Sequence, residues 1–337
     1  MKKTYLHRIA AAFLAAAMSL SLAACGEKAQ QPQEAAPQEA PQQTAQPEAP
    51  AEAPAEATAV TFTDDLGREV TVDSPKRVVI MLGSYADTWV LAGGKDSIAA
   101  CAEDSWGDFD LQLADSVAST GSILKPDLEA VISADPDFII ASSNTSSNME
   151  LLETFEKMDV PTAYFGVNSF DEYLHMLDIC TQITGCRENY QTYGLDVQKQ
   201  IEEAKTAIDD SKPTVLLIRV GGKSCNVKGS SGTVLGELLL DMGAVNIADS
   251  DQSLLENLSI EQIMKDDPQF IFVVFQGSDT EAAQKNLEET LLSNPAWSSL
   301  TAVSEGRYHV MDRTLFHLKP NANWGRSYET LAEILYK

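Results

Sequence analysis

The chain has 337 residues, a hydrophobic content of 44% and a formal net charge of −26. Such an acidic excess disfavours binding to nucleic acid or to anionic lipid, because both carry charge of the same sign. The length and apolar content suffice for two compact lobes, which we expect, or for one large domain.

Residues 1–24 have the pattern of a secretory signal peptide. Three basic residues lie within the first eight, and the apolar run that follows is too short to cross a bilayer comfortably. The run ends in Leu22-Ala-Ala-Cys25-Gly26, which resembles the lipobox of bacterial lipoproteins. The resemblance implies cleavage before Cys25 and a diacylglycerol on its thiol, so that lipid anchors the protein at the extracytoplasmic face of the cell membrane. The alternative is an ordinary cleaved signal with a passive cysteine nearby.

Residues 25–60 form a predicted tether. Ala, Gln, Glu and Pro dominate its composition, which offers too little apolar surface to fold. A Pro-rich chain extends by at most ~3.1 Å per residue, so the tether could hold a folded body up to roughly 100 Å from the lipid.

The remaining sequence alternates between predicted strands and helices. A hairpin is expected over residues 60–72, and apolar runs predict buried strands at residues 77–82, 97–102, 137–141, 214–220, 270–275 and 307–311. Helices are predicted at residues 85–91, 233–242 and 328–336, and over much of residues 170–210, with an interruption at Gly185. The alternation predicts an α/β fold with parallel-rich sheets. We expect an N-terminal lobe at 61–168, an interlobe helix region at 169–210 and a C-terminal lobe with a terminal helix at 211–337.

One pattern occurs in both predicted lobes. Glu129 precedes Pro136 by seven residues, Glu261 precedes Pro268 by seven, and an apolar strand follows each proline. Each unit predicts a short helix with an acidic residue in its first turn, ended by the proline. The helix dipole favours such a glutamate whatever its function, so each glutamate alone is explained by helix stability.

From about Thr61 to Lys337 the chain resembles the substrate-binding proteins of ATP-binding-cassette (ABC) importers for ferric siderophores, haem and cobalamin. The landmarks are residues 64–70 and 75–79, the two glutamate-proline units, the long helical connection and Asn323-Trp324 before the last helix. The resemblance implies the class III periplasmic-binding-protein fold, in which a single long helix joins two three-layer α/β lobes. It also implies a monomeric binding protein, not an enzyme and without cofactor, that passes its ligand from the interlobe cleft to a permease and its ATPase. Glu129 and Glu261 would then meet arginines on the permease.

Candidate ligand contacts follow the predicted strands, because ligands of open α/β sheets bind beyond the carboxyl ends of the strands. Arginine and lysine could pair with the carboxylates of a ferric siderophore or haem, whereas corrinoids favour aromatic and neutral polar contacts. Each side chain alone is better explained by packing or solvation than by ligand binding. The candidates are Ser84, Tyr85, Trp106, Ser143, Asn144, Arg219, Lys228, Gln276, Arg313 and Phe316.

Three other functions stay open. A binding protein for free zinc or manganese would need ligands such as His175, His309 and His317 to converge from distant positions. An exported hydrolase is disfavoured, because neither G-x-S-x-G nor H-E-x-x-H occurs. A sensor or scavenger with another partner is also compatible with the sequence. The cysteines after Cys25 form no metal-binding pattern, and the sequence leaves open whether Cys180 and Cys186 form a disulfide.

Overall fold

The computed structural model describes residues 59–256, 258–277 and 279–337. The predicted signal peptide, Cys25 and all but the last two residues of the predicted tether lie outside these ranges. No helix within them is both long enough and apolar enough to cross a bilayer.

The sheet of the N-terminal lobe has five parallel strands in the order β5-β4-β3-β8-β9. Every residue of β3, β8 and β9 is buried, as expected for a parallel sheet with both faces covered. The strands are β3 (Val78–Ile80), β4 (Ile98–Cys101), β5 (Ala118–Ser119), β8 (Phe138–Ser142) and β9 (Thr162–Phe165). The helices are α1 (Gly83–Leu91), α2 (Asp104–Gly107), α3 (Leu128–Ser133), α4 (Ser146–Met149) and α5 (Leu152–Lys157), and a small hairpin pairs β6 (Gly121–Ser122) with β7 (Lys125–Pro126).

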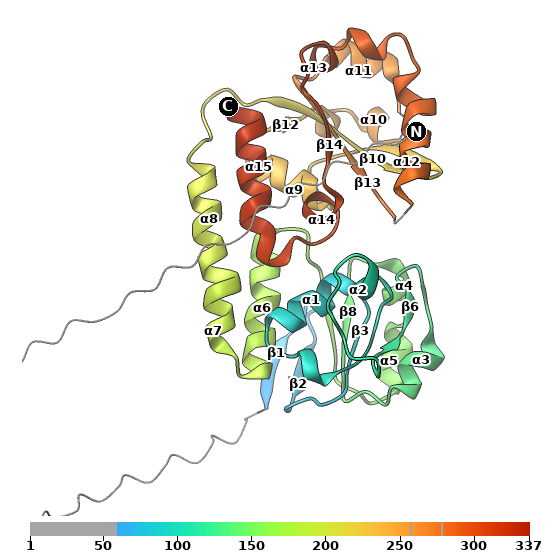
Figure 1. The fold of residues 1–337 in the computed structure, drawn as a ribbon, viewed down its shortest axis with the longest axis vertical. Helices are drawn as coiled ribbons and strands as arrows, with labels where there is room; N and C mark the ends of the chain where they lie inside the picture. The colour runs from blue at the N-terminus through green and yellow to red at the C-terminus, as the bar shows by residue number, and fades with distance from the viewer. Residues whose placement is uncertain (1–58, 257, 278) are drawn as a thin grey trace, which may run out of the picture. The chain divides into compact units, whose positions relative to one another are not determined.

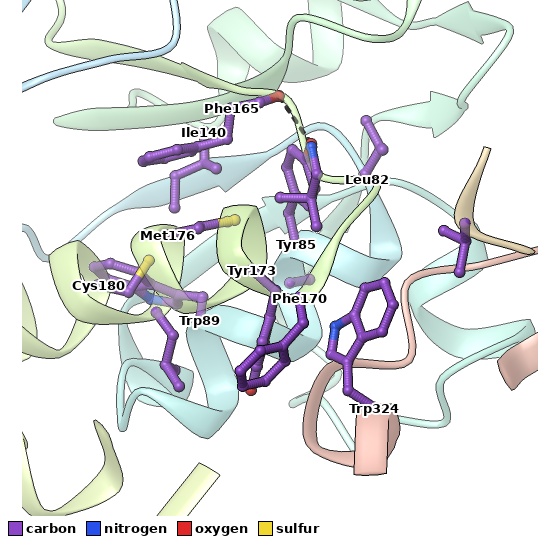
Figure 2. Close-up of a cluster of buried hydrophobic side chains, with 14 of the residues drawn as sticks. Leu82, Tyr85, Trp89, Ile140, Phe165, Phe170, Tyr173, Met176, Cys180 and Trp324 are labelled. Carbon is purple, nitrogen blue, oxygen red and sulfur yellow. Dashed lines mark hydrogen bonds between the residues drawn. The ribbon is translucent and has the colours of Figure 1, made fainter. Parts of the chain in front are cut away.

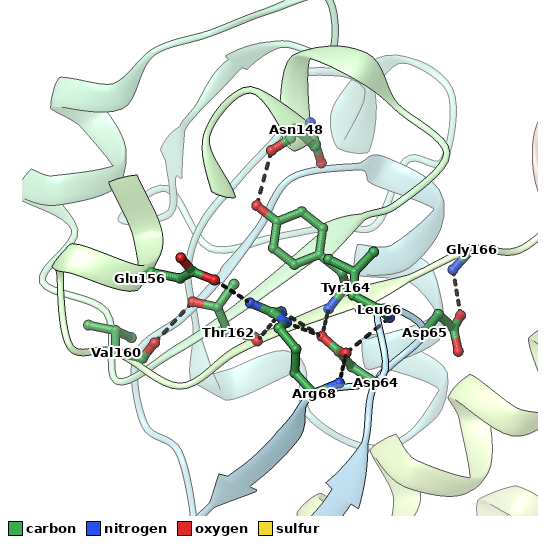
Figure 3. A network of polar contacts seen from close by, with 10 residues as sticks. All are labelled: Asp64, Asp65, Leu66, Arg68, Asn148, Glu156, Val160, Thr162, Tyr164 and Gly166. Atoms are coloured by element: carbon green, nitrogen blue, oxygen red, sulfur yellow. Dashed lines mark hydrogen bonds and ion pairs between the residues drawn. The ribbon is translucent and has the colours of Figure 1, made fainter. Parts of the chain in front are cut away.

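The predicted N-terminal hairpin is formed by β1 (Val60–Thr63) and β2 (Glu69–Val72), and a polar network joins its turn to β9 (Figure 3). Asp64, which is only 3% exposed, accepts hydrogen bonds from the backbone N–H groups of Leu66, Arg68 and Tyr164. The Arg68 guanidinium donates to the Asp64 carboxylate and to the Thr162 carbonyl, and lies 5.0 Å from the centre of the Tyr164 ring. Asp64 therefore satisfies donors of the turn and of β9 at once.

Two helical segments connect the lobes. A capping box of Ser169 and Glu172 starts α6 (Phe170–Thr184), which ends at Gly185 in the left-handed conformation with φ 76°. A second helix then runs without a break through α7 (Arg187–Tyr190), a π-helical turn (Gln191–Leu195) and α8 (Asp196–Lys205). Gly194 lies in the π turn, where an added Cβ would come within 2.7 Å of the Leu174 side chain of α6. The glycine thus permits the two helices to approach closely.

The sheet of the C-terminal lobe has the order β11-β10-β13-β14, and β12 pairs with β10. All pairs are parallel except the β10–β11 hairpin. The strands are β10 (Thr214–Gly221), β11 (Ser224–Lys228), β12 (Val245–Asn246), β13 (Phe270–Phe275) and β14 (Tyr308–Met311). The helices are α9 (Val234–Asp241), α10 (Gln252–Glu256), α11 (Ile260–Asp266), α12 (Thr280–Leu287), α13 (Thr301–Ser304), α14 (Arg313–Phe316) and α15 (Trp324–Tyr336), and α15 packs along α8 (Figure 1).

Buried aromatic side chains attach α15 to the first lobe (Figure 2). Trp324, the first residue of α15, is fully buried and packs edge-on against Phe170 of α6 with ring centroids 6.4 Å apart. Tyr173 and Met176 of α6 and Trp89 of α1 continue the same core cluster. The chain's last helix is therefore anchored on the connection between the lobes as well as on its own lobe.

Candidate ligand-binding cleft

Cationic side chains from three elements of the C-terminal lobe gather near one another. Across the β10–β11 hairpin, Lys228 pairs with Leu217, which lies two residues before Arg219. Alternate residues of a strand share a face, so Arg219 and Lys228 project from the same face of the sheet. Arg313, at the start of α14, and Lys319, which follows α14, complete what we call the cation cluster.

The pKa values of His317, Lys319 and Lys228 are shifted in part by the positive charges of neighbouring members of the cluster. Burial, with the charges of Arg219, Arg313 and Lys319, lowers the pKa of His317 to about 4. Burial lowers the pKa of Lys319 to about 8, opposed by Glu172 and assisted by Arg219. Burial, followed by the charge of Arg219, also lowers the pKa of Lys228. His317 is therefore neutral at pH 7, and the four other groups hold positive charge in a partly dehydrated site.

Most of the cation cluster is unpaired. Among the described residues, neither Arg219, Lys228 nor Lys319 has a carboxylate within ion-pair distance. Burial lowers the pKa of Arg219, and its Nε atom is buried without a hydrogen-bond partner in the described part of the chain. A buried, unpaired guanidinium costs free energy unless an anion meets it, so this arrangement is suited to an anionic ligand.

Arg313 is the exception, because it binds Asp108 of the N-terminal lobe. Nη1 of Arg313 lies 2.6 Å from Oδ1 of Asp108, and Nη2 lies 3.0 Å from Oδ2, so the pair is bidentate. Asp108 directly follows α2. Near it, both oxygens of Asp104 accept from the Gly83 N–H, and burial raises the pKa of Asp104 to about 6.

Two further contacts join the lobes beside this pair. The Asn321 side chain, which is 1% exposed, donates to the Ser84 carbonyl and to Oδ2 of Asp87, each at 2.8 Å. Nζ of Lys319 lies 3.4 Å from Oδ1 of Asn168. The segment after α14 is therefore held against the first lobe, while the charge of Lys319 lies near that of Arg219.

The structure brings together Arg219, Lys228 and Arg313 from the predicted ligand contacts. Phe316 lies near them but is 2% exposed and belongs to the core. Trp106 lies on α2, and with 38% exposure it is the most accessible tryptophan. Gln276 is half-buried and donates to the Ser224 hydroxyl at 3.2 Å.

The other predicted contacts lie elsewhere. Tyr85 is 1% exposed, and its hydroxyl donates to the Phe165 carbonyl, so the structure places it in the core rather than on the cleft surface. Tyr85 does not lie in the loop after β3, because α1 already begins at Gly83. Ser84 is buried as well, and its carbonyl serves the contact between the lobes. Ser143 and Asn144 line a hollow of about 430 Å³ together with Asp65, Asp171, Glu172 and His175.

Sequence reasoning missed Asp108, His317 and Lys319. The sequence could have indicated His317 and Lys319, because they follow β14 by six and eight residues and so belong to the loops beyond the carboxyl ends of strands. Asp108 had no such signal, since only the folded chain places it on Arg313.

The two glutamate-proline units are also structurally alike. The side chains of Asp127 and Ser259 cap α3 and α11, each by accepting from the backbone N–H three residues later. Glu129 and Glu261 follow in the first turn of each helix, and both are exposed. The residues that precede the prolines, Asp135 and Asp267, both have positive φ, at 49° and 37°. Each lobe thus presents one exposed glutamate on the same local scaffold.

A metal centre is not formed by the described residues, in which no group of three or more His, Cys, Asp or Glu side chains could hold an ion. His175, His309 and His317 lie in α6, in β14 and after α14, respectively. The four cysteines of this part of the chain, including Cys180 and Cys186, are free.

The model of the periplasmic binding protein family matches residues 78–315. The chain belongs to this family. Among its curated relatives, the Fe(3+)-citrate-binding protein YfmC of Bacillus subtilis is 24% identical over 258 residues, which span 74% of this chain and 77% of YfmC.

Solved periplasmic binding proteins share the fold. The periplasmic catecholate-siderophore binding protein VctP of Vibrio cholerae has a TM-score of 0.67 at 18% identity, covering 82% of this chain and 99% of VctP. A periplasmic heme-binding protein from Pseudomonas aeruginosa has a TM-score of 0.63 at 22% identity, covering 78% of this chain and 93% of that protein. The predicted class III periplasmic-binding-protein fold is confirmed.

Proposed function

We propose that this periplasmic binding protein captures an anionic ferric complex, a ferric siderophore or haem, at the cation cluster and delivers it to an ABC importer. The observation that carries the proposal is the unpaired state of Arg219, Lys228 and Lys319 in a protein of net charge −26. Selection for folding alone would neutralise such groups or leave them at the surface, because an unpaired charge in a partly dehydrated site is destabilising.

The relatives support a ferric ligand. YfmC, VctP and the Pseudomonas protein are named for ferric citrate, a catecholate siderophore and heme, all of which carry carboxylate or catecholate oxygens. Such oxygens form short, charge-assisted hydrogen bonds with guanidinium and ammonium groups. A corrinoid offers fewer anionic oxygens and would gain less from four cations, so it ranks behind ferric complexes and haem.

Delivery would use the exposed glutamates, Glu129 and Glu261. Their equivalent positions on α3 and α11 offer one acidic contact per lobe, as docking onto two basic sites of a permease requires. Each exposed ion pair contributes only about 0.2–1 kcal/mol, which is compatible with reversible docking of a monomeric binding protein. Cys25 would carry the lipid anchor at the extracytoplasmic face, and residues 26–60 would be the tether.

Fluorescence titration tests the ligand. We would titrate the chain from Gly26 onward, produced without leader and lipid, with ferric citrate, a ferric catecholate, haemin and cobalamin. We expect saturable quenching by an anionic ferric complex or haemin, and an affinity at least tenfold lower in Arg219→Gln and Lys228→Gln, because each removes a charge-assisted contact of about 1.5–3 kcal/mol.

Lys223→Gln is the matched control, since Lys223 is an exposed lysine in the β10–β11 turn and should leave the affinity unchanged. Equal affinity of the Arg219 and Lys228 variants and the wild type would exclude the cation cluster as the binding site. A response to zinc or manganese alone would favour a carrier of free metal ions.

A further inference from the structure

We propose that Asp108 is the resident anion of the ligand cleft, so that an incoming anionic complex has to displace its carboxylate from Arg313. Asp108 would then determine which anionic complexes the protein accepts. The proposal rests on the proposed function, because it concerns the same cleft.

The first support is the geometry of the pair. The two residues are 205 positions apart and belong to different lobes, yet their side chains form two parallel bonds of 2.6 and 3.0 Å. Each side chain is only 18% exposed, so water competes weakly for either partner. Bidentate carboxylate pairing is among the strongest contacts that an arginine makes, and here it fills the guanidinium edge that would bind a ligand carboxylate.

The second support is the contrast with the other cations. Arg219, Lys228 and Lys319 have no ion pair among residues 59–256, 258–277 and 279–337, so a ligand can meet them without displacing a protein carboxylate. At Arg313 a ligand carboxylate would only replace the carboxylate of Asp108. One ligand oxyanion therefore gains little there, and a net gain requires that the ligand engage several cations at once.

The surroundings of Asp108 make its release costly. Asp104 lies close enough that the charge of Asp108 helps to raise its pKa, whereas the charge of Arg313 lowers it. Once a ligand takes Arg313, the carboxylates of Asp104 and Asp108 face each other without their shared counter-ion. The exchange thus favours polyanionic complexes over neutral or singly charged ones.

The direction of the change in ligand affinity distinguishes this proposal from the opposite role for Asp108. If Asp108 instead oriented Arg313 for the ligand, removing its charge would weaken binding. If Asp108 competes with the ligand, removing its charge would strengthen binding and loosen the empty cleft.

The variant is Asp108→Asn, with Asp110→Asn as the matched control. Asp110 is an exposed carboxylate two residues further on, and it accepts a hydrogen bond from the Gln112 side chain. Both variants remove one negative charge from the same loop. Asp108→Glu keeps the charge and should behave as the wild type, which separates charge from a change of side chain.

The first measurement needs no ligand. Trp106 is 38% exposed, whereas Trp89, Trp297 and Trp324 are at most 3% exposed, so quenching by neutral acrylamide reports on α2 beside Asp108. We expect the quenching constant of the empty protein to rise in Asp108→Asn and to stay unchanged in Asp110→Asn.

The second measurement is the Kd for ferric citrate, a polycarboxylate complex. We expect Asp108→Asn to bind roughly tenfold more tightly, since a charge-assisted hydrogen bond of the protein no longer has to be broken, and Asp110→Asn to stay within about twofold. Unchanged or weaker binding by Asp108→Asn would overturn the proposal. If no ferric complex bound to any variant, both the proposed function and the displacement proposal would fail. A rise in acrylamide quenching would then still show that the Asp108 carboxylate limits access to Trp106.

Discussion

Lys319 offers a test in which stability and binding should change in opposite directions. In the empty protein its ammonium group is partly dehydrated, and burial lowers its pKa from 10.5 to about 8. That difference corresponds to about 3 kcal/mol of free energy, at 1.36 kcal/mol per tenfold change in proton affinity. Because part of the side chain remains accessible to water, the value is an upper bound.

Lys319→Met keeps the aliphatic stem and removes the charge. We expect the variant to be more stable than the wild type by about 1–3 kcal/mol at pH 7, because the dehydration cost disappears and exceeds what is lost, namely a 3.4 Å contact with Asn168 and the attraction of Glu172. We also expect its affinity for an anionic ferric complex to fall about tenfold. Urea unfolding followed by circular dichroism measures the first quantity, and the fluorescence titration measures the second.

The pH dependence has a definite sign. Between pH 8 and 10.5 the folded wild type has released the Lys319 proton while the unfolded chain still binds it, so this group raises stability as the pH increases. The advantage of Lys319→Met should therefore be largest below pH 8 and should vanish near pH 10.5. Buried thiols and tyrosines titrate in the same range, so the difference between variant and wild type carries the Lys319 contribution.

Lys223→Met is the control, because Lys223 is exposed and should change stability by less than about 0.5 kcal/mol. A loss of stability in Lys319→Met, or an unchanged affinity for every ferric complex, would refute the assignment of Lys319 as a strained binding cation.

Two further predictions concern the scaffold and the docking surface. Asp64→Asn should lower the free energy of unfolding by about 3 kcal/mol, because the new amide NH₂ would face N–H groups that now donate to the buried carboxylate. Asp135→Asn is the control: its side chain is 94% exposed, and the substitution should cost less than about 0.5 kcal/mol. Equal urea midpoints would contradict the role of Asp64. Glu129→Ala and Glu261→Ala should each reduce ferric uptake by cells up to about fivefold without changing ligand affinity. The control is Glu153→Ala, at an exposed glutamate of α5, which should change neither uptake nor ligand affinity. Normal uptake by the double variant would exclude these glutamates from docking.

The sequence predicts the central strands of both sheets well, because parallel strands that are covered on both faces consist of continuous apolar runs. The predicted strand at 137–141 matches β8 at Phe138–Ser142, and the one at 270–275 matches β13. The predicted interruption at Gly185 is the left-handed end of α6. The π turn at 191–195 was not predicted, and the close approach of Gly194 to Leu174 within it is a tertiary contact that the sequence does not display.

The site was harder to predict than the fold, because a residue's place after a strand does not fix the direction of its side chain. Tyr85 follows β3 as expected for a ligand contact, but it lies in the first turn of α1 and faces the core. The structure brings the predicted cations Arg219, Lys228 and Arg313 near one another, whereas the pairing of Arg313 with Asp108 depends on how the two lobes meet. The predicted aromatic contacts Tyr85 and Phe316 are buried in the core, because aromatic residues serve packing more often than binding.

The chain carries a net negative charge whereas the cation cluster is positive, and the range of electrostatic forces explains how both can hold. At physiological ionic strength the screening length is about 8 Å, so the acidic surface has little influence on an ion already inside the cleft. If an anion binds at the cation cluster as proposed, the nearest charges would be those of Arg219, Lys228 and Lys319, together with Arg313 once Asp108 is displaced. Because the positive side chains are unpaired and partly dehydrated, their attraction for an anion is weakened less by water than that of a surface lysine. The same dehydration costs free energy, and we expect an anion that binds at the cation cluster to offset part of that cost.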